Sequence, residues 1–334
     1  MRSSRHYGHL ILVLVGLAGG GRLPAAELFI CGTSYSEKRA AVVKLTPGED
    51  AARLEVVDSA PLAGGGCAIA WHPRHGVLCT MDKEATCRVF RLSPAGRLEH
   101  VCDGQLHGGY CFLALDRQGR HLLGASYESG AVDVYRLDAA GFPAELTASR
   151  DEGRTMAHSV AATGRLEPLA PPQPEISACS GPRHPVFHPT KPFVYFSNEQ
   201  QLGVSGFRIG ADGRLALLEE MAAPGTKPSQ GLAGSDIVIT PDGRFLYVGV
   251  RGFEDPLQAV FAYRIGEDGR LAAVGRTDTD ALAMAPDGQR VFVSAARAGT
   301  LTSYRIFADG TLNREAAVQI GKDFWALTVM PGAG

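Results

Sequence analysis

The stretch SDIVITPDGRFLYVGV, residues 235–250, decides the fold of this chain. Apolar and β-branched residues stand on both sides of the turn Pro241-Asp242-Gly243. Short runs of this kind around a Pro/Asp/Gly turn are typical of two strands joined in a β-hairpin. The same arrangement recurs at residues 186–196 and 284–293. We therefore expect the hairpin to be part of a repeated unit.

A second mark recurs along the whole chain, a turn followed by Arg-Leu or a close variant. It begins at residues 52, 96, 141, 164, 213, 269 and 310, so the successive steps are 44, 45, 23, 49, 56 and 41 residues. Further strand-like stretches lie between the marks. Four short strands in each repeat of about 40–50 residues are the signature of a β-propeller blade. The sequence predicts an all-β fold, a β-propeller that is seven-bladed in ancestry.

One unit is too short, and one stretch stands outside the repeats. From residue 157 the chain reaches Gly164-Arg165-Leu166 about 22 residues sooner than in the other units, measured against a repeat of about 45. This predicts a truncated fourth blade that lacks roughly two of its four strands. Residues 324–330 form one more β-like stretch after the last unit. We expect it to complete the first blade, which begins at residues 28–30, because ring closure removes exposed sheet edges.

The N-terminus has the order of a secretory signal peptide. Arg2 and Arg5 precede an apolar run over residues 10–18, and Leu23-Pro24-Ala25-Ala26 provides small residues for cleavage. Nine apolar residues are too few to span a bilayer, which needs roughly 20. We expect residues 1–26 to be a signal peptide, residues 27–334 to form a single propeller domain, and the mature protein to be exported, periplasmic or extracellular, with no stable membrane span.

Composition narrows the classes of partner and cofactor. The formal net charge is -2, and no run of Lys or Arg follows the first few residues, so we expect no nucleic-acid partner. The seven cysteines include no Cys-x-x-Cys pair, and the His pairs flank hairpin turns without an acidic partner. Phosphate-binding, dinucleotide-binding and Gly-x-Ser-x-Gly motifs are absent from the sequence. We expect no metal and no cofactor, while the oligomeric state stays open.

Hairpin geometry brings several polar residues to one end of the ring. The start of the first strand and the end of the second lie at the same end of an antiparallel hairpin. Arg183 precedes the strand at 185–188 and Glu199 follows the strand at 193–197, so both should lie on one rim. Asp236 and Arg251 should share that rim in the next blade. If the first strand of each blade is innermost, these groups face the mouth of the central channel.

The segment GPRHPVFHP at 181–189, with Asn-Glu at 198–199, resembles the lactonase family of seven-bladed propellers, typified by 6-phosphogluconolactonase, and so does the segment 235–252. Carboxymuconate cyclases look similar, with the same fold and the same site pattern. The resemblance implies a site built from His158 in a His-Ser-Val element, Arg183, Glu199 and Arg251. His158 begins the short fourth unit.

The resemblance implies a lactonase, a hydrolase that opens the ester bond of a small-molecule sugar lactone. Arg183 and Arg251, together with His184 and Asp236, are the expected substrate-binding residues, and the two guanidiniums suit a phosphate, a carboxylate or a developing oxyanion. Glu199 or His158 is the expected base, with Glu199 favoured because its blade is intact. Two alternatives stay open: a non-catalytic propeller that binds a ligand or protein, and a carboxymuconate-type cyclase. Charged residues at strand ends are also commonly solvated or paired between blades.

Overall fold

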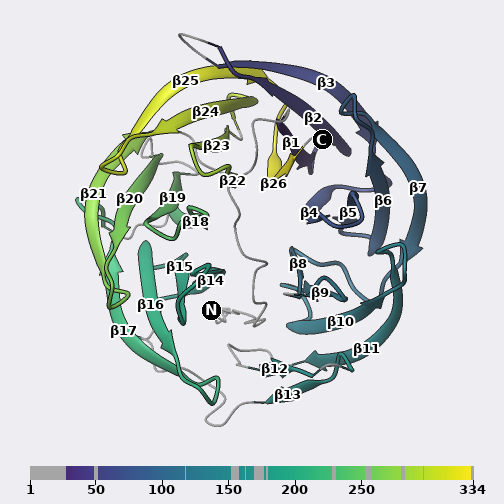
Figure 1. Cartoon of the computed structure of the whole chain (residues 1–334), viewed down its shortest axis with the longest axis horizontal. Helices are drawn as coiled ribbons and strands as arrows, with labels where there is room; N and C mark the ends of the chain where they lie inside the picture. Colours follow the sequence, from purple (N-terminus) through teal and green to yellow (C-terminus); the bar gives the residue numbers. More distant parts are fainter. Residues whose placement is uncertain are drawn as a thin grey trace, which may run out of the picture.

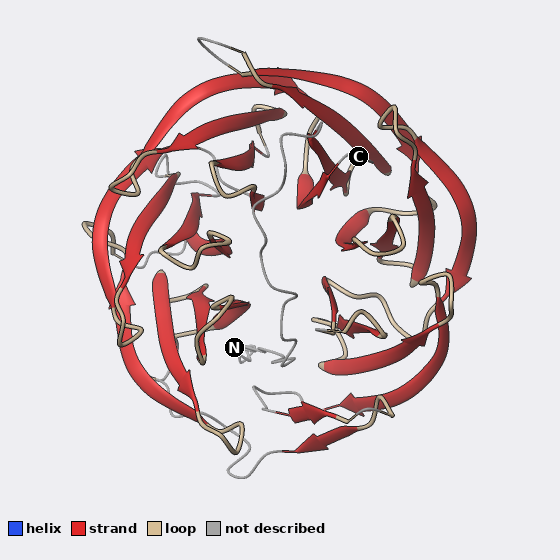
Figure 2. Ribbon diagram, viewed as in Figure 1, coloured by secondary structure: helices blue, strands red, loops and turns tan. Residues whose placement is uncertain are grey.

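A computed structural model describes residues 28–48, 52–116, 118–151, 158–161, 163–168, 177, 180–227, 231–252, 258–279, 283–295 and 297–331. Within these residues every regular element is a β-strand, drawn red in Figure 2, and none is a helix that could cross a membrane. The strands form six four-stranded antiparallel sheets and one two-stranded sheet.

The sheets follow one another along the chain as blades. Blade one is β26 (Phe324–Pro331), β1 (Leu28–Ser34), β2 (Arg39–Thr46) and β3 (Arg53–Pro61). Blade two is β4 (Gly66–His72), β5 (Val77–Asp82), β6 (Thr86–Leu92) and β7 (Leu98–Gln105), and blade three is β8 (Phe112–Leu115), β9 (His121–Ala125), β10 (Ala131–Leu137) and β11 (Pro143–Asp151). The two-stranded sheet is β12 (His158–Val160) and β13 (Leu166–Pro168).

Three further blades complete the ring. Blade five is β14 (Pro182–Phe187), β15 (Phe193–Asn198), β16 (Gly203–Ile209) and β17 (Leu215–Ala222). Blade six is β18 (Leu232–Ile239), β19 (Phe245–Gly252), β20 (Ala259–Ile265) and β21 (Leu271–Asp278), and blade seven is β22 (Ala283–Pro286), β23 (Arg290–Ala295), β24 (Thr300–Ile306) and β25 (Leu312–Gln319).

The blades are arranged in a circle, as Figure 1 shows. In the four-stranded blades the first strand of the sheet lies toward the centre and the fourth strand forms the outer wall. The prediction of an all-β propeller is confirmed. The condition for the rim argument, an innermost first strand, holds in blades five and six, which carry the predicted residues.

The repeated Arg-Leu mark has a structural cause. It is the turn before the fourth strand, and its glycine has a positive φ, +87° at Gly269 and +94° at Gly310. A Cβ atom on Gly269 would lie 2.7 Å from the ring of Phe193 in the preceding blade, and one on Gly310 would lie 2.4 Å from Phe245. Tyr195 also donates its hydroxyl to the carbonyl of Gly269 at 2.7 Å. At Gly269 and Gly310 the mark is therefore a contact point between neighbouring blades, where both the backbone conformation and the available space require glycine.

The ring closes as the sequence predicts. The last strand, β26, pairs antiparallel with β1 along its whole length, from Leu28 opposite Pro331 to Ser34 opposite Phe324. The innermost strand of blade one therefore comes from the C-terminal end of the chain, and its three outer strands come from the other end. This pairing covers the inner edge of β1, and β26 takes the innermost place in the blade.

The fourth unit is seen only in part. His158 pairs with Pro168 across the two-stranded sheet of β12 and β13. Residues 152–157, 169–176 and 178–179 lie outside the described residues, so the truncation of the fourth blade stays a prediction. The segment for which we expect a signal peptide, residues 1–26, also lies outside them.

The second strand of each four-stranded blade is the rigid part of the scaffold. Every residue of β1, β5, β9, β15, β19 and β23 is buried. Neighbouring blades cover both faces of these strands, which explains why they read as continuous apolar runs. Residues at the rim end of these strands are consequently held on a well-packed base.

Candidate active site

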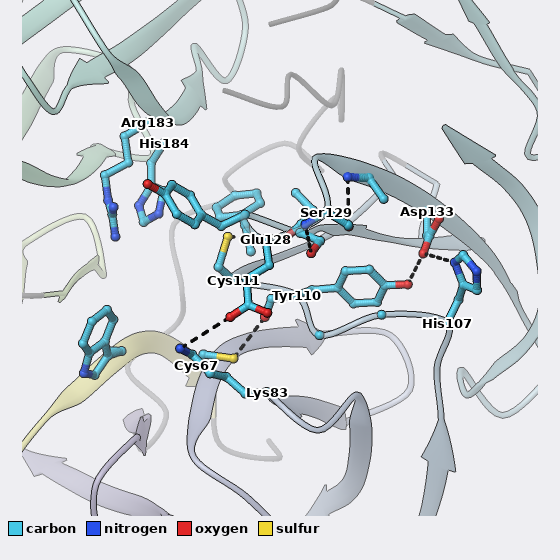
Figure 3. A pocket seen from close by; sticks show the side chains of 18 of the residues that line it. Cys67, Lys83, His107, Tyr110, Cys111, Glu128, Ser129, Asp133, Arg183 and His184 are labelled. Carbon is cyan, nitrogen blue, oxygen red and sulfur yellow. Dashed lines mark hydrogen bonds and ion pairs between the residues drawn. The ribbon is translucent and has the colours of Figure 1, made fainter. Parts of the chain in front are cut away.

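A cavity of about 640 Å³ opens at the rim of the ring. Four of the residues predicted from the sequence line it: Arg183, His184, Glu199 and Arg251. Residues of blades one, two and three form the other walls, and Figure 3 shows Arg183 and His184 on one wall, with Lys83, Tyr110 and Asp133 across the cavity. Its volume lies within the range of about 300–1,000 Å³ that is typical of small-molecule sites.

Two arginines converge on one carboxylate oxygen. Oε1 of Glu199 accepts a hydrogen bond from Arg183 at 2.9 Å and another from Arg251 at 3.1 Å. Arg183 lies in β14, Glu199 directly follows β15, and Arg251 lies in β19, so the contact joins blades five and six. We call Arg183, Glu199 and Arg251 the cavity cluster. The hairpin argument placed these three residues on one rim, and the structure brings them into contact.

The backbone beneath Glu199 is fixed by both blades. Its amide donates to the carbonyl of Gly181 at 2.7 Å, and its carbonyl accepts from the amide of Gly234 at 2.9 Å. A Cβ atom on Gly234 would lie 2.4 Å from the carbonyl oxygen of Asn198. Only glycine therefore permits this close approach between the two blades.

The cavity cluster carries more positive than negative charge. Two guanidiniums and one carboxylate give a formal charge of +1. The pKa of Arg251 is lowered to about 10, first by burial and then by the nearby charge of Arg183, while Glu199 opposes both effects. Arg251 also lies over the ring of Trp325, 5.8 Å from its centroid. The cluster is thus suited to an anionic group or to an oxygen that gains negative charge.

His184 and Asp236 form a second polar pair beside the cluster. Nδ1 of His184 lies 3.1 Å from Oδ1 of Asp236. The same Oδ1 accepts the amide of Ile237 at 2.9 Å, and Oδ2 accepts the amide of Met284 in blade seven at 2.8 Å. Burial lowers the pKa of His184, and this effect outweighs the hydrogen bond to Asp236, which raises it. Asp236 is therefore a firmly held carboxylate behind a neutral imidazole.

Two β-bulges explain how these side chains reach the same place. Arg183 and His184 together oppose one residue of β15, because the register shifts between Pro182 and Pro185. Asp236 lies in a matching shift between Gly234 and Ile237 of β18. Successive residues of a regular strand point to opposite faces, and a bulge re-aims one of them. This is how the adjacent Arg183 and His184 both line the cavity.

The backbone of His158 belongs to β12, and its side chain lies outside what the structure describes. The assignment of His158 as a base stays a prediction.

Sequence reasoning missed the opposite wall of the cavity. Tyr35, Lys83 and Trp325 line it. Tyr35 and Trp325 have ring centroids 5.8 Å apart, and Nζ of Lys83 lies 5.1 Å from the centre of the Tyr35 ring. Tyr35 follows β1 and Lys83 follows β5 just as Glu199 follows β15. The hairpin rule that found Glu199 would have found both residues if applied to every blade.

Two thiols line the cavity, Cys67 and Cys111, and burial raises the pKa of both. Cys67 donates its Sγ proton to the carbonyl of Tyr110 at 3.1 Å, and burial raises its pKa to about 12. A thiol in this state is a poor nucleophile at neutral pH. The six cysteines in the described part of the chain are free, and no group of three His, Cys, Asp or Glu side chains there is arranged to hold a metal ion.

Comparison with known proteins shows which family this chain belongs to and which known structures share its fold. Residues 29–160 and 156–327 match the family described as "Lactonase, 7-bladed beta-propeller". The 6-phosphogluconolactonase of Cronobacter sakazakii is 30% identical over 204 residues, covering 54% of this chain and 60% of that protein. The 6-phosphogluconolactonase of Yersinia enterocolitica is 27% identical over 275 residues, covering 73% of this chain and 81% of that protein. The match to the Cronobacter protein thus spans less than two thirds of that relative.

Solved structures show the same fold at low identity. The periplasmic gluconolactonase of Pseudomonas aeruginosa superposes with a TM-score of 0.77 at 19% identity, over 92% of this chain and 100% of that one. A protein from Lactobacillus plantarum gives a TM-score of 0.77 at 15% identity, over 91% of this chain and 99% of that one.

Proposed function

Because this chain belongs to the lactonase family of seven-bladed β-propellers, we propose that it is a carboxylic ester hydrolase that opens a sugar lactone. The relatives named 6-phosphogluconolactonase support this reaction class. The observation that carries the proposal is the convergence of Arg183 and Arg251 on Oε1 of Glu199 in the cavity wall.

The reaction needs a place for negative charge. Water attacks the carbonyl carbon of the lactone, and the carbonyl oxygen becomes an oxyanion before the ring C–O bond breaks. The guanidiniums of Arg183 and Arg251 are positioned to stabilise that oxyanion and the carboxylate product. Glu199 holds the two like charges together while no substrate is bound. A lactone is an activated ester, so a covalent nucleophile is not required.

The opposite wall suits a sugar ring. Trp325 is 39% exposed although it lies in the innermost strand β26. Together with Tyr35 it presents an aromatic surface on which the C–H face of a ring can rest, as in many small-molecule sites. Lys83 adds a positive charge on the same wall, 3.9 Å from Glu128. A phosphate or a second carboxylate on the lactone would face this lysine.

The remaining sequence expectations belong to the same proposal. The order of basic, apolar and small residues in segment 1–26 supports a cleaved signal peptide, export to the periplasm or beyond, and a single mature domain from residue 27. The short spacing before Gly164 supports a fourth blade reduced to two strands. Export favours a sugar or organic-acid lactone available outside the cytoplasm, with or without a phosphate.

A panel of lactones tests the proposal. The full chain is incubated with sugar lactones with and without a 6-phosphate and with a simple aliphatic lactone, and acid release is followed against an enzyme-free blank. We expect turnover of at least one sugar lactone well above the blank. No turnover of any lactone, together with tight binding of a macromolecular partner, would instead establish the non-catalytic propeller.

A further inference from the structure

The base of the proposed reaction is not decided by the cavity cluster alone. Oε1 of Glu199 already accepts hydrogen bonds from Arg183 and Arg251. A proton placed on this carboxylate would weaken two charge-assisted hydrogen bonds and leave two like charges close together. Glu199 is therefore better suited to hold the arginines than to take a proton from water.

His184 has the arrangement that a general base needs. Its carboxylate partner, Asp236, is held by backbone amides from blades six and seven, so the carboxylate accepts and Nδ1 of His184 donates. In a neutral imidazole the other nitrogen, Nε2, then carries the lone pair. Within the described part of the chain Nε2 makes no hydrogen bond, and the ring lies in the cavity wall beside Arg183, as Figure 3 shows.

The surroundings keep the imidazole in place and neutral. The amide of His184 donates to Oγ of the buried Ser197 at 3.2 Å, which satisfies a backbone group released by the bulge. The ring of Phe112 covers one side, with centroids 5.4 Å apart. The charged groups that face the ring are Asp236, Arg183 and Arg251; burial and the two arginines lower the pKa of His184, and Asp236 raises it.

The geometry points to His184 as the general base of lactone hydrolysis and to Asp236 as the residue that positions it. This inference rests on the proposed lactonase function. Nε2 of His184 accepts a proton from water as the water oxygen bonds to the carbonyl carbon, and the carbonyl electron pair moves onto its oxygen. When the tetrahedral intermediate collapses, the ring C–O bond breaks and Nε2 returns the proton to the leaving ring oxygen. The products are a hydroxyl and a carboxylic acid, which releases its proton to solvent and becomes a carboxylate, and the imidazole is neutral again.

Kinetics of four variants test this assignment. We expect His184→Gln to lower kcat by about 10²–10⁴-fold with little change in KM, as for loss of a general base. Asp236→Asn should lower kcat by about 10–100-fold, as for loss of an orienting partner. Glu199→Gln should lose less activity than His184→Gln. His100→Gln is the matched control, because His100 forms an exposed pair with Asp103 at 3.0 Å on the outer strand β7, and its activity should not change.

Two readouts separate a base from a structural residue. Imidazole in the buffer should restore part of the activity of His184→Ala and none of that of Asp236→Asn. The acid limb of kcat/KM should lie below pH 6.5, the ordinary pKa of the group, and should move to still lower pH in Asp236→Asn because the raising effect of the carboxylate is gone.

NMR of the wild-type protein provides a test that does not require any variant to fold. We expect the Nδ1-protonated tautomer of His184 at neutral pH. An Nε2-protonated tautomer, or an active wild type whose His184→Gln variant keeps its kcat while Glu199→Gln loses it, would overturn the assignment and leave the lactonase function standing. A wild type that turns over no lactone would refute the proposed function itself, and the base assignment with it.

Discussion

Two arginine–glutamate–arginine clusters in this molecule share their chemistry and differ in how the charges are connected. In strands β23, β24 and β25 of blade seven, Oε2 of Glu315 accepts from Arg290 at 2.8 Å and Oε1 accepts from Arg305 at 2.5 Å. Asp287 lies 3.6 Å from Arg290 and balances the second positive charge. The Glu315 side chain is only 6% exposed. We call Arg290, Glu315 and Arg305 the blade-seven cluster.

The cavity cluster contains the same residue types, but its charges are connected differently. Both arginines converge on Oε1 of Glu199, whose side chain is 30% exposed to the cavity. In the blade-seven cluster each carboxylate oxygen has its own arginine, whereas in the cavity cluster both arginines share one oxygen. The first arrangement belongs to the buried scaffold, and the second places guanidinium groups beside a cavity, where they suit an anion. A ligand-binding cluster and a structural cluster can therefore contain the same residue types and differ in how their charges are paired.

The largest expected difference is in activity. Arg251→Ala should lower kcat/KM for the best lactone by about 10²–10³-fold, the usual cost of removing one donor to an oxyanion. Arg305→Ala is the matched arginine control and should change kcat/KM by less than about twofold, because Arg305 lies in β24 and does not line the cavity. Initial rates on the purified variants provide the measurement. Equal losses in both variants would break the distinction between the clusters.

The next difference is in stability. Glu315→Gln removes the main countercharge of Arg290, whose side chain is 10% exposed. The substitution should lower the free energy of unfolding by about 3 kcal/mol. Glu199→Gln should cost only about 1 kcal/mol, because the Glu199 side chain is 30% exposed, against 6% for Glu315. Equilibrium urea unfolding compares the two free energies of unfolding. A cost for Glu199→Gln as large as that for Glu315→Gln would make the cavity cluster a structural element.

How far the sequence predicts these features depends on how local they are. The ring, its closure by β26 and the shared rim of Arg183 and Glu199 follow from hairpin geometry within one or two blades. The contact of His184 with Asp236 does not, because it depends on two bulges in different blades whose register shifts have no sequence mark. Ring closure by β26 was predicted, but the hairpin rule was not applied to blade one, so the wall formed by Trp325 was missed.

The affinity for the anionic product provides a further comparison of the two clusters. Glu199→Gln removes the negative charge that competes for the two arginines, so the hydroxy-acid product should bind about threefold more tightly than it does to the wild type. Glu315→Gln should bind it with unchanged affinity. Isothermal titration calorimetry measures both dissociation constants. Weaker binding of the product to Glu199→Gln would show that Glu199 itself contacts the ligand.

The smallest effect concerns acid pH. Burial raises the pKa of Glu315, but the hydrogen bonds from Arg305 and Arg290 outweigh it and lower the pKa below its ordinary value of 4.5. A depressed carboxylate pKa gives stability that is present above the unfolded-state pKa and is lost as pH falls through the folded-state pKa. The cost of Glu315→Gln should therefore shrink between about pH 6 and about pH 3. Unfolding free energies at both pH values check this, and a cost that grows with acid would contradict it.

The most direct measurement is a crystal structure of the full chain with the hydroxy-acid product bound at saturation. We expect the product carboxylate within hydrogen-bond distance of both Arg183 and Arg251, with its carbon chain along Trp325 and a hydroxyl facing Nε2 of His184. An empty cavity at saturating product, or a product bound elsewhere on the ring, would contradict the assignment of the cavity cluster as the active site.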